Sequence, residues 1–315
     1  MTRPSTGQPA LRGKLKAEAR DLVLHYAMRT LPTEACSNLG AWFGTTLGQR
    51  GYPAADARAR RLLALLRPDL AATPESLEAS LRLLWQNVGR TYAEFAALHR
   101  MIPQGRTLMS DPERLDQAYA DDRPLILCFV HLGNWEVLGQ QVASHELIDR
   151  GRPFTAVVMP PANRAHAHIA AGRRASLPVD FVPMGRRVWH TVADCLRRPR
   201  GIVWLAADEA ANGLVSAPHF GRHPRTDGHL AKIVRLAAAT GARVLPMYNE
   251  RVGPVRFQSH VLPILDMPRG RLDEHEISTQ VMRIDAVFAP IVKRLLTQWY
   301  MAIEFGDEPD NPVAG

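Results

Sequence analysis

Leu125-Ile-Leu-Cys-Phe-Val-His131, followed by Leu-Gly-Asn-Trp-Glu136, is the stretch of the sequence that decides the fold. An uninterrupted apolar run of this length that ends at a polar residue is typical of a strand buried on both faces. The Gly133-Asn134 pair favours a tight turn, and a helix is predicted over residues 136–146. In α/β proteins, ligands bind at the carboxyl ends of the strands. His131 is therefore the first candidate functional residue.

The alternation of short β-rich runs with helical runs continues along the chain. Strands are predicted over residues 154–159, 179–182, 201–206, 243–248 and 256–262. Helices are predicted over residues 162–174, 188–197, 230–239 and 275–299. Strand alternating with helix predicts an α/β fold with a central mixed or mostly parallel sheet flanked by helices.

The first hundred residues are predicted to be helical. Thr73 suits an N-cap and Pro74 the first helical position. Apolar residues then recur at spacings of three and four: Leu77, Leu81, Leu84, Val88, Tyr92 and Phe95. We divide the chain into a polar basic N-terminal segment at residues 1–20, a helical membrane-proximal layer at 21–100 and one integrated α/β core at 101–315.

Composition and charge limit the function classes. The chain has 315 residues, of which 46% are apolar and 22% charged, so it can bury a large core and is neither disordered nor collagen-like. Its 39 Lys and Arg against 31 Asp and Glu give a net charge of +8, which favours anionic partners. Three cysteines, Cys36, Cys128 and Cys195, are too widely spaced for a disulfide framework and indicate a reducing compartment.

The N-terminal region lacks the apolar core of a secretory signal, so we expect a cytosolic protein. Residues 22–47 are apolar but interrupted by charged residues, and no membrane-spanning helix is predicted there. Two interpretations stay open: core helices with a solvated lead-in, or amphipathic segments anchored by Trp42 and Phe43 at a lipid interface. In the second, the phospholipid contacts are Arg12, Lys14, Lys16 and Arg20.

His131 and Glu136 form a candidate catalytic pair. A strand, a tight turn and a first helical turn can fold back so that the two side chains meet. A carboxylate bonded to one imidazole nitrogen raises the basicity of the other, which makes the histidine a general base for a hydroxyl. Such a pair needs no cofactor and suits the transfer of a preactivated acyl group to an alcohol. The alternative is that both residues are structural.

His131-Leu-Gly-Asn-Trp-Glu136 resembles the H-x4-D/E motif of the lysophospholipid acyltransferase superfamily, in the form closest to the late acyltransferases of lipid A biosynthesis. Further segments are similar to that family: Leu39-Gly-Ala-Trp-Phe-Gly44, Val203-Trp-Leu-Ala-Ala-Asp208, Ala217-Pro-His-Phe-Gly221 and Gln298-Trp-Tyr300. The likeness extends over about residues 20–305. Two features depart from the family: charges break its apolar N-terminal helix, and Glu209 stands beside Asp208 where a neutral residue is more familiar.

The resemblance implies roles for single residues. It implies His131 as the general base and Glu136 as the carboxylate that orients it. It implies that Asp208, with Glu209 beside it, lies where polar groups of the acceptor or donor are held. It also implies a basic substrate-binding residue, for which Arg173 is the nearest match.

Two points about substrate binding stay open. Arg174 or Arg186 is an alternative counterpart of the family's basic residue. The oxyanion of the tetrahedral intermediate needs donors, and these are expected from backbone N–H groups of the Gly133-Asn134 turn, from the following helix N-terminus or from an arginine. Asn134 is therefore counted among the substrate-binding residues.

The resemblance implies an acyltransferase that moves a fatty acyl chain from acyl carrier protein or coenzyme A to a hydroxyl of a lipid or glycolipid. A lipid A precursor is the leading acceptor, while other glycolipids, ornithine-type lipids and lysophospholipids stay open. The positive charge favours acyl carrier protein as donor and an anionic membrane surface as partner. The expected location is the cytoplasmic face of the inner membrane, peripheral or monotopic.

Three other interpretations remain. The loop with His219, His223 and His229 would suit a metal-dependent hydrolase, but its spacing matches no zinc motif and no metal is predicted. Arg186, Arg187, Arg197, Arg198 and Arg200 would suit a nucleic-acid-binding protein, but no recognition motif accompanies them and no nucleic-acid partner is predicted. A noncatalytic membrane-surface protein is the third alternative, and the presence of both members of the candidate pair argues against it.

Overall fold

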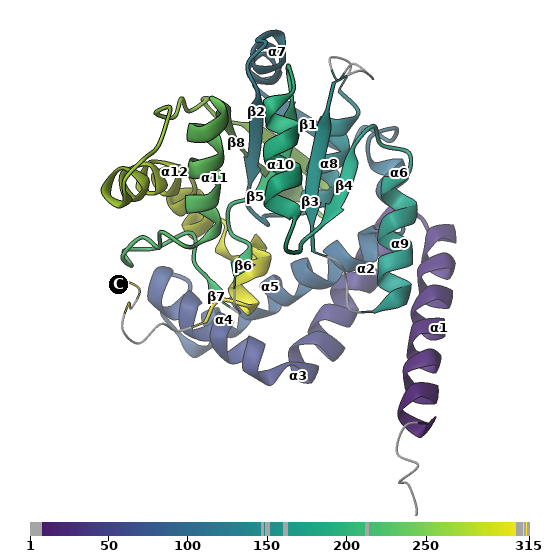
Figure 1. Cartoon of the computed structure of the whole chain (residues 1–315). Helices are drawn as coiled ribbons and strands as arrows, with labels where there is room; N and C mark the ends of the chain where they lie inside the picture. Colours follow the sequence, from purple (N-terminus) through teal and green to yellow (C-terminus); the bar gives the residue numbers. More distant parts are fainter. Residues whose placement is uncertain are drawn as a thin grey trace, which may run out of the picture.

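Seven strands form one mixed sheet in the order β1-β9-β8-β2-β5-β3-β4 (Figure 1). Neighbouring strands pair in parallel except β8 and β9, which form an antiparallel hairpin. The strands are β1 (Thr107–Ser110), β2 (Leu125–Phe129), β3 (Phe154–Val158), β4 (Asp180–Pro183), β5 (Ile202–Ala206), β8 (Arg243–Gly253) and β9 (Arg256–Val261). The predicted mostly parallel α/β sheet is thus confirmed. A separate two-stranded ribbon pairs β6 (Ala210–Ala211) with β7 (Leu214–Val215).

The computed structural model describes residues 8–145, 148, 152–159, 163–211, 214–306, 311 and 313, with side chains from residue 18 onward. The side chains of Arg12, Lys14 and Lys16, proposed as phospholipid contacts, and the first seven residues of the polar basic segment lie outside this part. Arg20 is described: it is exposed and pairs with Asp21.

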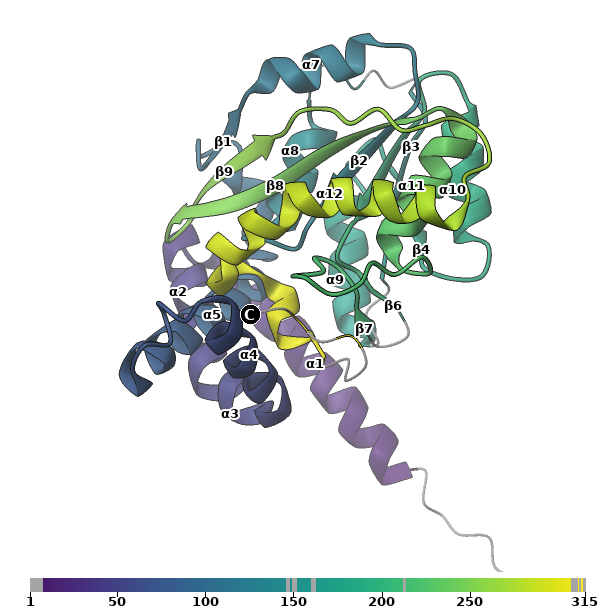
Figure 2. The same cartoon turned by 90° about the vertical axis from the view of Figure 1, so that its left-hand side faces the viewer.

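Alternation along β2 divides the protein core between the two faces of the sheet. Ile126 and Cys128 pack with α10 (Val188–Arg197), α11 (His229–Thr240) and α12 (Glu274–Arg294). Leu125, Leu127 and Phe129 pack with α7 (Pro112–Ala120) and α8 (Trp135–Ala143) on the other face. Helices cover both faces, as Figure 2 shows, and every residue of β2 is buried. This two-sided burial is the reason for the strand's continuous apolar sequence.

A helical layer precedes the sheet and lies against the carboxyl ends of its central strands (Figure 1). It consists of α1 (Gln8–Thr30), α2 (Thr33–Phe43), a π-helical turn at Gly44–Gly48, α3 (Gln49–Gly51), α4 (Pro53–Leu66), α5 (Pro74–Glu94) and α6 (Leu98–Met101). Thr73 caps α5 as predicted, because its hydroxyl accepts a hydrogen bond from the Ser76 amide. Helix α1 runs beside α9 (Arg164–Arg174) and extends away from the rest of the protein.

Glycines allow α2 and α5 to cross in direct backbone contact. A Cβ atom at Gly40 would lie 2.5 Å from the carbonyl oxygen of Gly89, and one at Gly44 would lie 2.0 Å from the Trp85 carbonyl oxygen. Any side chain there would force the helices apart. The Leu-Gly-x-x-x-Gly segment at residues 39–44 is therefore a packing motif between these two helices.

Within the described residues, no helix combines the length and the apolar character that a membrane crossing requires. Apolar side chains are nevertheless exposed on the helical layer. They include Val23, Leu24 and Tyr26 on α1, Trp42 on α2, Leu47 in the π-helical turn, and Tyr52. Trp42 is exposed as the interfacial interpretation requires, whereas Phe43 is only partly exposed and lies against the Trp42 ring.

Candidate active site

His131 and Asp208 follow two neighbouring parallel strands at equivalent positions. In the register of β2 and β5, Phe129 lies opposite Ala206. His131 and Asp208 each follow these partners by two residues, so the pairing of the strands brings them to the same edge of the sheet. The Nδ1 atom of His131 lies 2.8 Å from Oδ1 of Asp208.

Three donors fix the Asp208 carboxylate. Besides the His131 ring, the backbone amide of His131 donates to Oδ2 over 2.8 Å, and the indole Nε1 of Trp299 donates to the same oxygen over 2.7 Å. Asp208 is completely buried. It therefore orients the imidazole and has no surface for a substrate, which corrects the expectation that it holds polar groups of the acceptor or donor.

The expected contact between His131 and Glu136 is wrong. The carboxylate of Glu136, in the first turn of α8, forms an ion pair with the guanidinium of Arg174 on α9. Its charge still reaches His131 and helps to raise the pKa of the imidazole. The pairing was mistaken because Asp208 lies 77 positions away in the sequence and only the strand register brings it close.

The C-terminal Gln298-Trp-Tyr300 segment closes over the turn that follows β2. Leu132 forms an antiparallel bridge with Trp299, and the Tyr300 amide donates to the carbonyl of His131 over 2.9 Å. The Gly133 amide donates to the carbonyl of Gln298 over 3.1 Å. The Gly133 N–H expected to bind the oxyanion is thus already engaged.

Aromatic rings surround the imidazole. Trp135 meets it edge-on with ring centroids 4.8 Å apart, Phe129 lies at 5.3 Å and Tyr300 at 6.5 Å. The side chain of His131 keeps 11% of its surface exposed. Because Nδ1 faces Asp208, Nε2 is the nitrogen left for a substrate proton. The hydroxyl of Tyr300 lies 2.9 Å from that of Tyr92, which stands at the exposed side of this group.

The surroundings raise the pKa of both His131 and Glu209. Burial alone would lower the pKa of His131, but the charge of Asp208 and its hydrogen bond, with help from Glu209 and Glu136, raise it above the ordinary 6.5. Burial raises the pKa of Glu209, next to Asp208, against the opposing effect of His131. Glu209 is partly exposed and accepts a hydrogen bond from the Ala210 amide over 3.2 Å. Glu209 thus keeps exposed surface, whereas Asp208 has none.

The three candidate arginines lie in different places. Arg174 lies beside the turn that follows β2, through its ion pair with Glu136. Arg173 points elsewhere and donates to Nδ1 of His99 over 3.2 Å. Arg186 is exposed just before α10. Arg174 is thus the one that contacts the H-x4-E segment.

Asn134 is structural, which corrects its assignment as a substrate-binding residue. It is fully buried, its Oδ1 caps α8 by accepting from the Glu136 amide, and its Nδ2 donates to Glu94 over 2.9 Å. Its carbonyl accepts from Nδ2 of Asn249 over 2.6 Å. Gly133 before it has φ +56°, and a Cβ there would lie 2.7 Å from the Asn249 carbonyl oxygen, so glycine is required.

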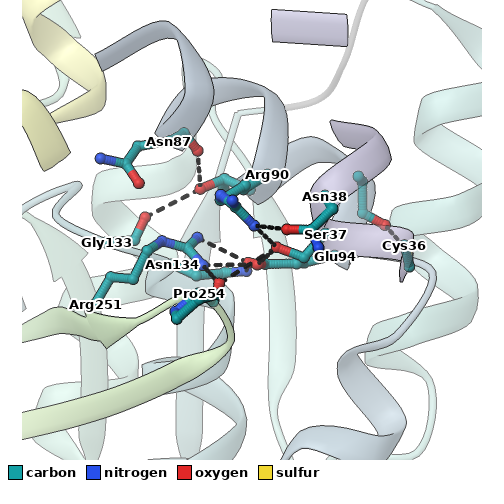
Figure 3. A network of polar contacts seen from close by, with 12 residues as sticks. Cys36, Ser37, Asn38, Asn87, Arg90, Glu94, Gly133, Asn134, Arg251 and Pro254 are labelled. Atoms are coloured by element: carbon teal, nitrogen blue, oxygen red, sulfur yellow. Dashed lines mark hydrogen bonds and ion pairs between the residues drawn. The ribbon is translucent and has the colours of Figure 1, made fainter. Parts of the chain in front are cut away.

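A buried ion pair between Glu94 and Arg251, which the sequence analysis missed, supports the turn that follows β2 (Figure 3). Both oxygens of Glu94 accept from Arg251, over 2.7 and 2.9 Å, and Ser37 on α2 donates to the same carboxylate over 2.7 Å. Glu94 is completely buried. Together with Asn134, these residues join α2, α5, β8 and the turn that follows β2. Glu94 ends a helix with no local polar motif around it, so no sequence signal marks it.

The structure gives little support to the metal-site and nucleic-acid interpretations. His219 pairs with Asp285 over 2.9 Å, His229 is buried and hydrogen-bonds the Ala206 carbonyl, and His223 is exposed. Within the described residues, no group of three or more His, Cys, Asp or Glu side chains has the arrangement of a metal site. The cluster of five arginines is divided between the two ends of the ten-residue helix α10, about 15 Å apart. It therefore presents no single surface to a nucleic acid.

The sequence was also compared with models of known protein families and with curated proteins. The model of the family described as bacterial lipid A biosynthesis acyltransferase matches residues 21–303. The match includes the strand ends, the turn and the C-terminal segment that meet at His131. The comparison with curated proteins gives no match.

Proposed function

Because the chain belongs to the bacterial lipid A biosynthesis acyltransferase family, it is an acyltransferase, and we propose that His131 and Asp208 carry out its chemistry. In the proposed reaction, a fatty acyl chain moves from an acyl thioester to a hydroxyl of a lipid or glycolipid. The leading acceptor is a lipid A precursor. The family match supports the reaction class, and the arrangement of the two residues supports the mechanism.

The single observation that carries the mechanism is the hydrogen bond between Nδ1 of His131 and the buried Asp208. A carboxylate in this position fixes the tautomer that leaves Nε2 free to accept a proton, and it stabilises the imidazolium that results. No nucleophilic serine or cysteine is needed, because the acyl group arrives activated as a thioester.

The reaction follows from this arrangement. His131 Nε2 takes the proton of the acceptor hydroxyl while the hydroxyl oxygen attacks the thioester carbonyl. A C–O bond forms and an oxyanion develops. When the intermediate collapses, the C–S bond breaks and the imidazolium returns the proton to the departing thiolate. Acid–base catalysis of this kind contributes roughly 100- to 10,000-fold to a rate.

Glu136 and Arg174 take a supporting role in this proposal. Their ion pair ties α8 to α9 next to the histidine, with both side chains less than one-fifth exposed. The charge of Glu136 favours the protonated imidazole that forms during the reaction. We assign the oxyanion role to Arg174, because the Gly133 amide is engaged and Arg174 is the candidate arginine that contacts the H-x4-E segment. Glu209, which is partly exposed and lies three residues after the end of β5, is the proposed acceptor-side contact.

We place the protein at the cytoplasmic face of the inner membrane as a peripheral protein. The exposed apolar residues of the helical layer support this location, since a lipid interface is the environment that favours them. The net charge of +8 supports an anionic lipid surface and an acidic acyl carrier protein as donor, with acyl-CoA as the alternative.

Mass spectrometry of membrane lipids tests this function. Lipids from cells with the gene, without it, and complemented with His131→Ala are compared. The proposal predicts that one acyl chain disappears from one lipid class on deletion and returns with the parent gene but not with the variant. Restoration by His131→Ala, or a lipid profile unchanged by deletion, would refute it.

A further inference from the structure

Two phenol groups meet beside the imidazole of His131. Tyr92 comes from α5 of the helical layer, and Tyr300 is the last residue of the closing Gln298-Trp-Tyr300 segment. Their hydroxyl oxygens lie 2.9 Å apart, and their rings meet edge-on with centroids 6.2 Å apart. The chemistry proposed for His131 and Asp208 uses neither hydroxyl.

The backbone fixes the position of Tyr300 relative to His131. The Tyr300 amide donates to the His131 carbonyl over 2.9 Å. The preceding residue, Trp299, donates through its indole to Asp208 over 2.7 Å. The centroid of the Tyr300 ring lies 6.5 Å from that of the imidazole and 5.3 Å from that of the Trp135 ring. Tyr300 is therefore tied to the residues that orient the histidine, and its ring flanks the imidazole.

The hydroxyl pair has one proton more than its mutual hydrogen bond uses. Each phenol carries one proton, and only one of the two is donated between the oxygens. Within the part of the chain that the structure describes, neither hydroxyl has a further hydrogen-bond partner. Burial raises the pKa of both Tyr92 and Tyr300 above the ordinary 10.0, so both phenols stay neutral at physiological pH. The pair thus offers one O–H to water or to a ligand.

This free O–H has two possible owners. When Tyr300 donates to Tyr92, the free proton belongs to Tyr92, which is 55% exposed and reaches water. When Tyr92 donates to Tyr300, the free proton belongs to Tyr300, beside the imidazole. Rotation of two hydroxyl hydrogens separates the two arrangements. A ligand oxygen next to His131 therefore selects the second one without any movement of the fold.

The proposed reaction needs a donor of this kind. The oxyanion sites of serine proteases and α/β-hydrolases each use two donors. Here the Gly133 amide is engaged by the Gln298 carbonyl, and Arg174 is the one side chain assigned so far. A phenolic O–H is among the groups that stabilise an oxyanion in enzymes, because it is a neutral donor held in a fixed direction.

We propose that Tyr300 is a catalytic residue that donates its phenolic O–H to the oxyanion of the tetrahedral intermediate, and that Tyr92 is a positioning residue that donates to Tyr300. The thioester carbonyl oxygen gains negative charge as the acceptor hydroxyl attacks, and the hydrogen bond from Tyr300 strengthens with that charge. No proton passes through it. The charge leaves the oxygen when the C–S bond breaks, so both phenols end the cycle unchanged. This role rests on the proposed acyl transfer.

Steady-state kinetics of the parent, Tyr300→Phe, Tyr92→Phe and the double variant test the assignment with the acceptor that the lipid comparison identifies. Tyr300→Phe should lower kcat by about 100-fold with little change in KM, because the lost hydrogen bond belongs to the transition state. Tyr92→Phe should lower kcat by about 2- to 10-fold, the equivalent of one ordinary hydrogen bond. The double variant should match Tyr300→Phe, since Tyr92 acts only through Tyr300. Additive losses, or a raised KM at unchanged kcat, would overturn the proposal.

Tyr248→Phe is the matched control. The Tyr248 hydroxyl on β8 accepts from Arg294 over 3.4 Å, so this variant also removes a phenolic hydroxyl that makes one hydrogen bond. It should keep the parental kcat. Unfolding midpoints of all variants are recorded beside the rates. Equal losses of kcat in Tyr248→Phe and Tyr300→Phe would show that Tyr300 acts on the fold alone.

A tetrahedral anion tests the same contact without turnover. Monomethyl dodecylphosphonate presents anionic oxygens on a tetrahedral phosphorus next to an alkyl chain, as the intermediate does on carbon. Calorimetric titration should give an affinity about 100-fold weaker for Tyr300→Phe than for the parent or Tyr248→Phe. Equal affinity in the three proteins, or binding in none of them, would overturn the proposal.

The outcome for Tyr300 is separable from that for the proposed function. An inactive His131→Ala together with a fully active Tyr300→Phe would refute the phenol donor and leave the function standing. The backbone amides at the start of α8 would then be the donors that act beside Arg174. A lipid profile unchanged by gene deletion, with a phosphonate affinity that still depends on Tyr300, would refute the lipid acyl transfer and retain the anion contact.

Discussion

Oδ1 of Asp208 lies 2.8 Å from Nδ1 of His131, and Oδ2 of the same carboxylate accepts from the backbone amide of His131. One buried side chain thus fixes both the ring and the main chain of the residue at the end of β2. The parallel register that pairs Phe129 with Ala206 produces this relationship. The two residues outside the H-x4-E motif that orient the histidine, Asp208 and Trp299, both come from later parts of the chain.

Asp208→Asn is predicted to lower kcat by about 100-fold or more. The amide cannot stabilise the imidazolium as a carboxylate does, and it favours the wrong tautomer of the ring. Steady-state kinetics of the purified variant with a thioester donor measure the effect.

The chain provides a matched control in Asp285→Asn. Asp285 accepts from Nδ1 of His219 over 2.9 Å and from the His219 backbone amide over 2.8 Å, in an equally buried place. Both variants should lower the midpoint of chemical unfolding, and only Asp208→Asn should lower kcat of the folded fraction by this amount. Equal losses of kcat in the two variants would show that Asp208 acts on the fold alone.

The pH dependence of transfer follows from the raised pKa of His131. A general base must be neutral, so kcat/KM should rise with pH through a midpoint above 6.5. Asp208→Asn removes the main cause of the upward shift and leaves burial, which lowers the pKa, so this midpoint should move to lower pH. For stability the sign is opposite: the contribution of the charged His131 is complete below 6.5 and is lost as pH rises through the folded-state pKa. A midpoint that does not move in Asp208→Asn would contradict this assignment.

Glu136→Gln should reduce kcat less than Asp208→Asn, by about 10-fold, because Glu136 pairs with Arg174 and acts on His131 only through its charge. Rates of Glu136→Gln, Arg174→Gln and the double variant form a double-mutant cycle. The two changes should be strongly non-additive. Additive effects, or a loss in Glu136→Gln as large as in His131→Ala, would instead favour a direct dyad of His131 and Glu136.

Glu94→Gln should destabilise the fold by about 3–5 kcal/mol, because it leaves Arg251 buried beside a neutral group. The matched control is Glu78→Gln, which removes a carboxylate from the exposed ion pair with Arg60 and should change stability by about 0.5 kcal/mol or less. Urea unfolding of the three proteins compares them. If Glu94→Gln is no more destabilised than Glu78→Gln, the network is not a structural link.

Continuous apolar runs and helical periodicity were sufficient to predict much of the fold. Helix α10 has the predicted bounds, Val188–Arg197, and β2 and β5 lie within their predicted ranges because burial on both faces requires apolar residues throughout. The edge strand β1 and helix α7 were missed. Strand β1 has four residues and little burial, so it carries no apolar run to detect.

The candidate site was predictable only in part. His131 was found because it ends a buried strand, which is a local property. The identity of its partner, Asp208, depends on which strands become neighbours and in which register. Residues 125–136 alone determine neither. Asn134 was misassigned because an asparagine in a turn gives the same sequence signal whether it caps a helix or contacts a substrate. Glu94 and Arg251 were missed because a buried ion pair between distant segments has no spacing pattern.

The central claim is that the imidazole of His131 accepts the proton of the acceptor hydroxyl. The most direct measurement is the initial rate of acyl transfer by purified parent and His131→Ala at saturating donor and acceptor, with unfolding midpoints recorded for both. The account predicts a fall of about 100-fold or more in a variant that remains folded. A folded His131→Ala protein that transfers at close to the parental rate would contradict it.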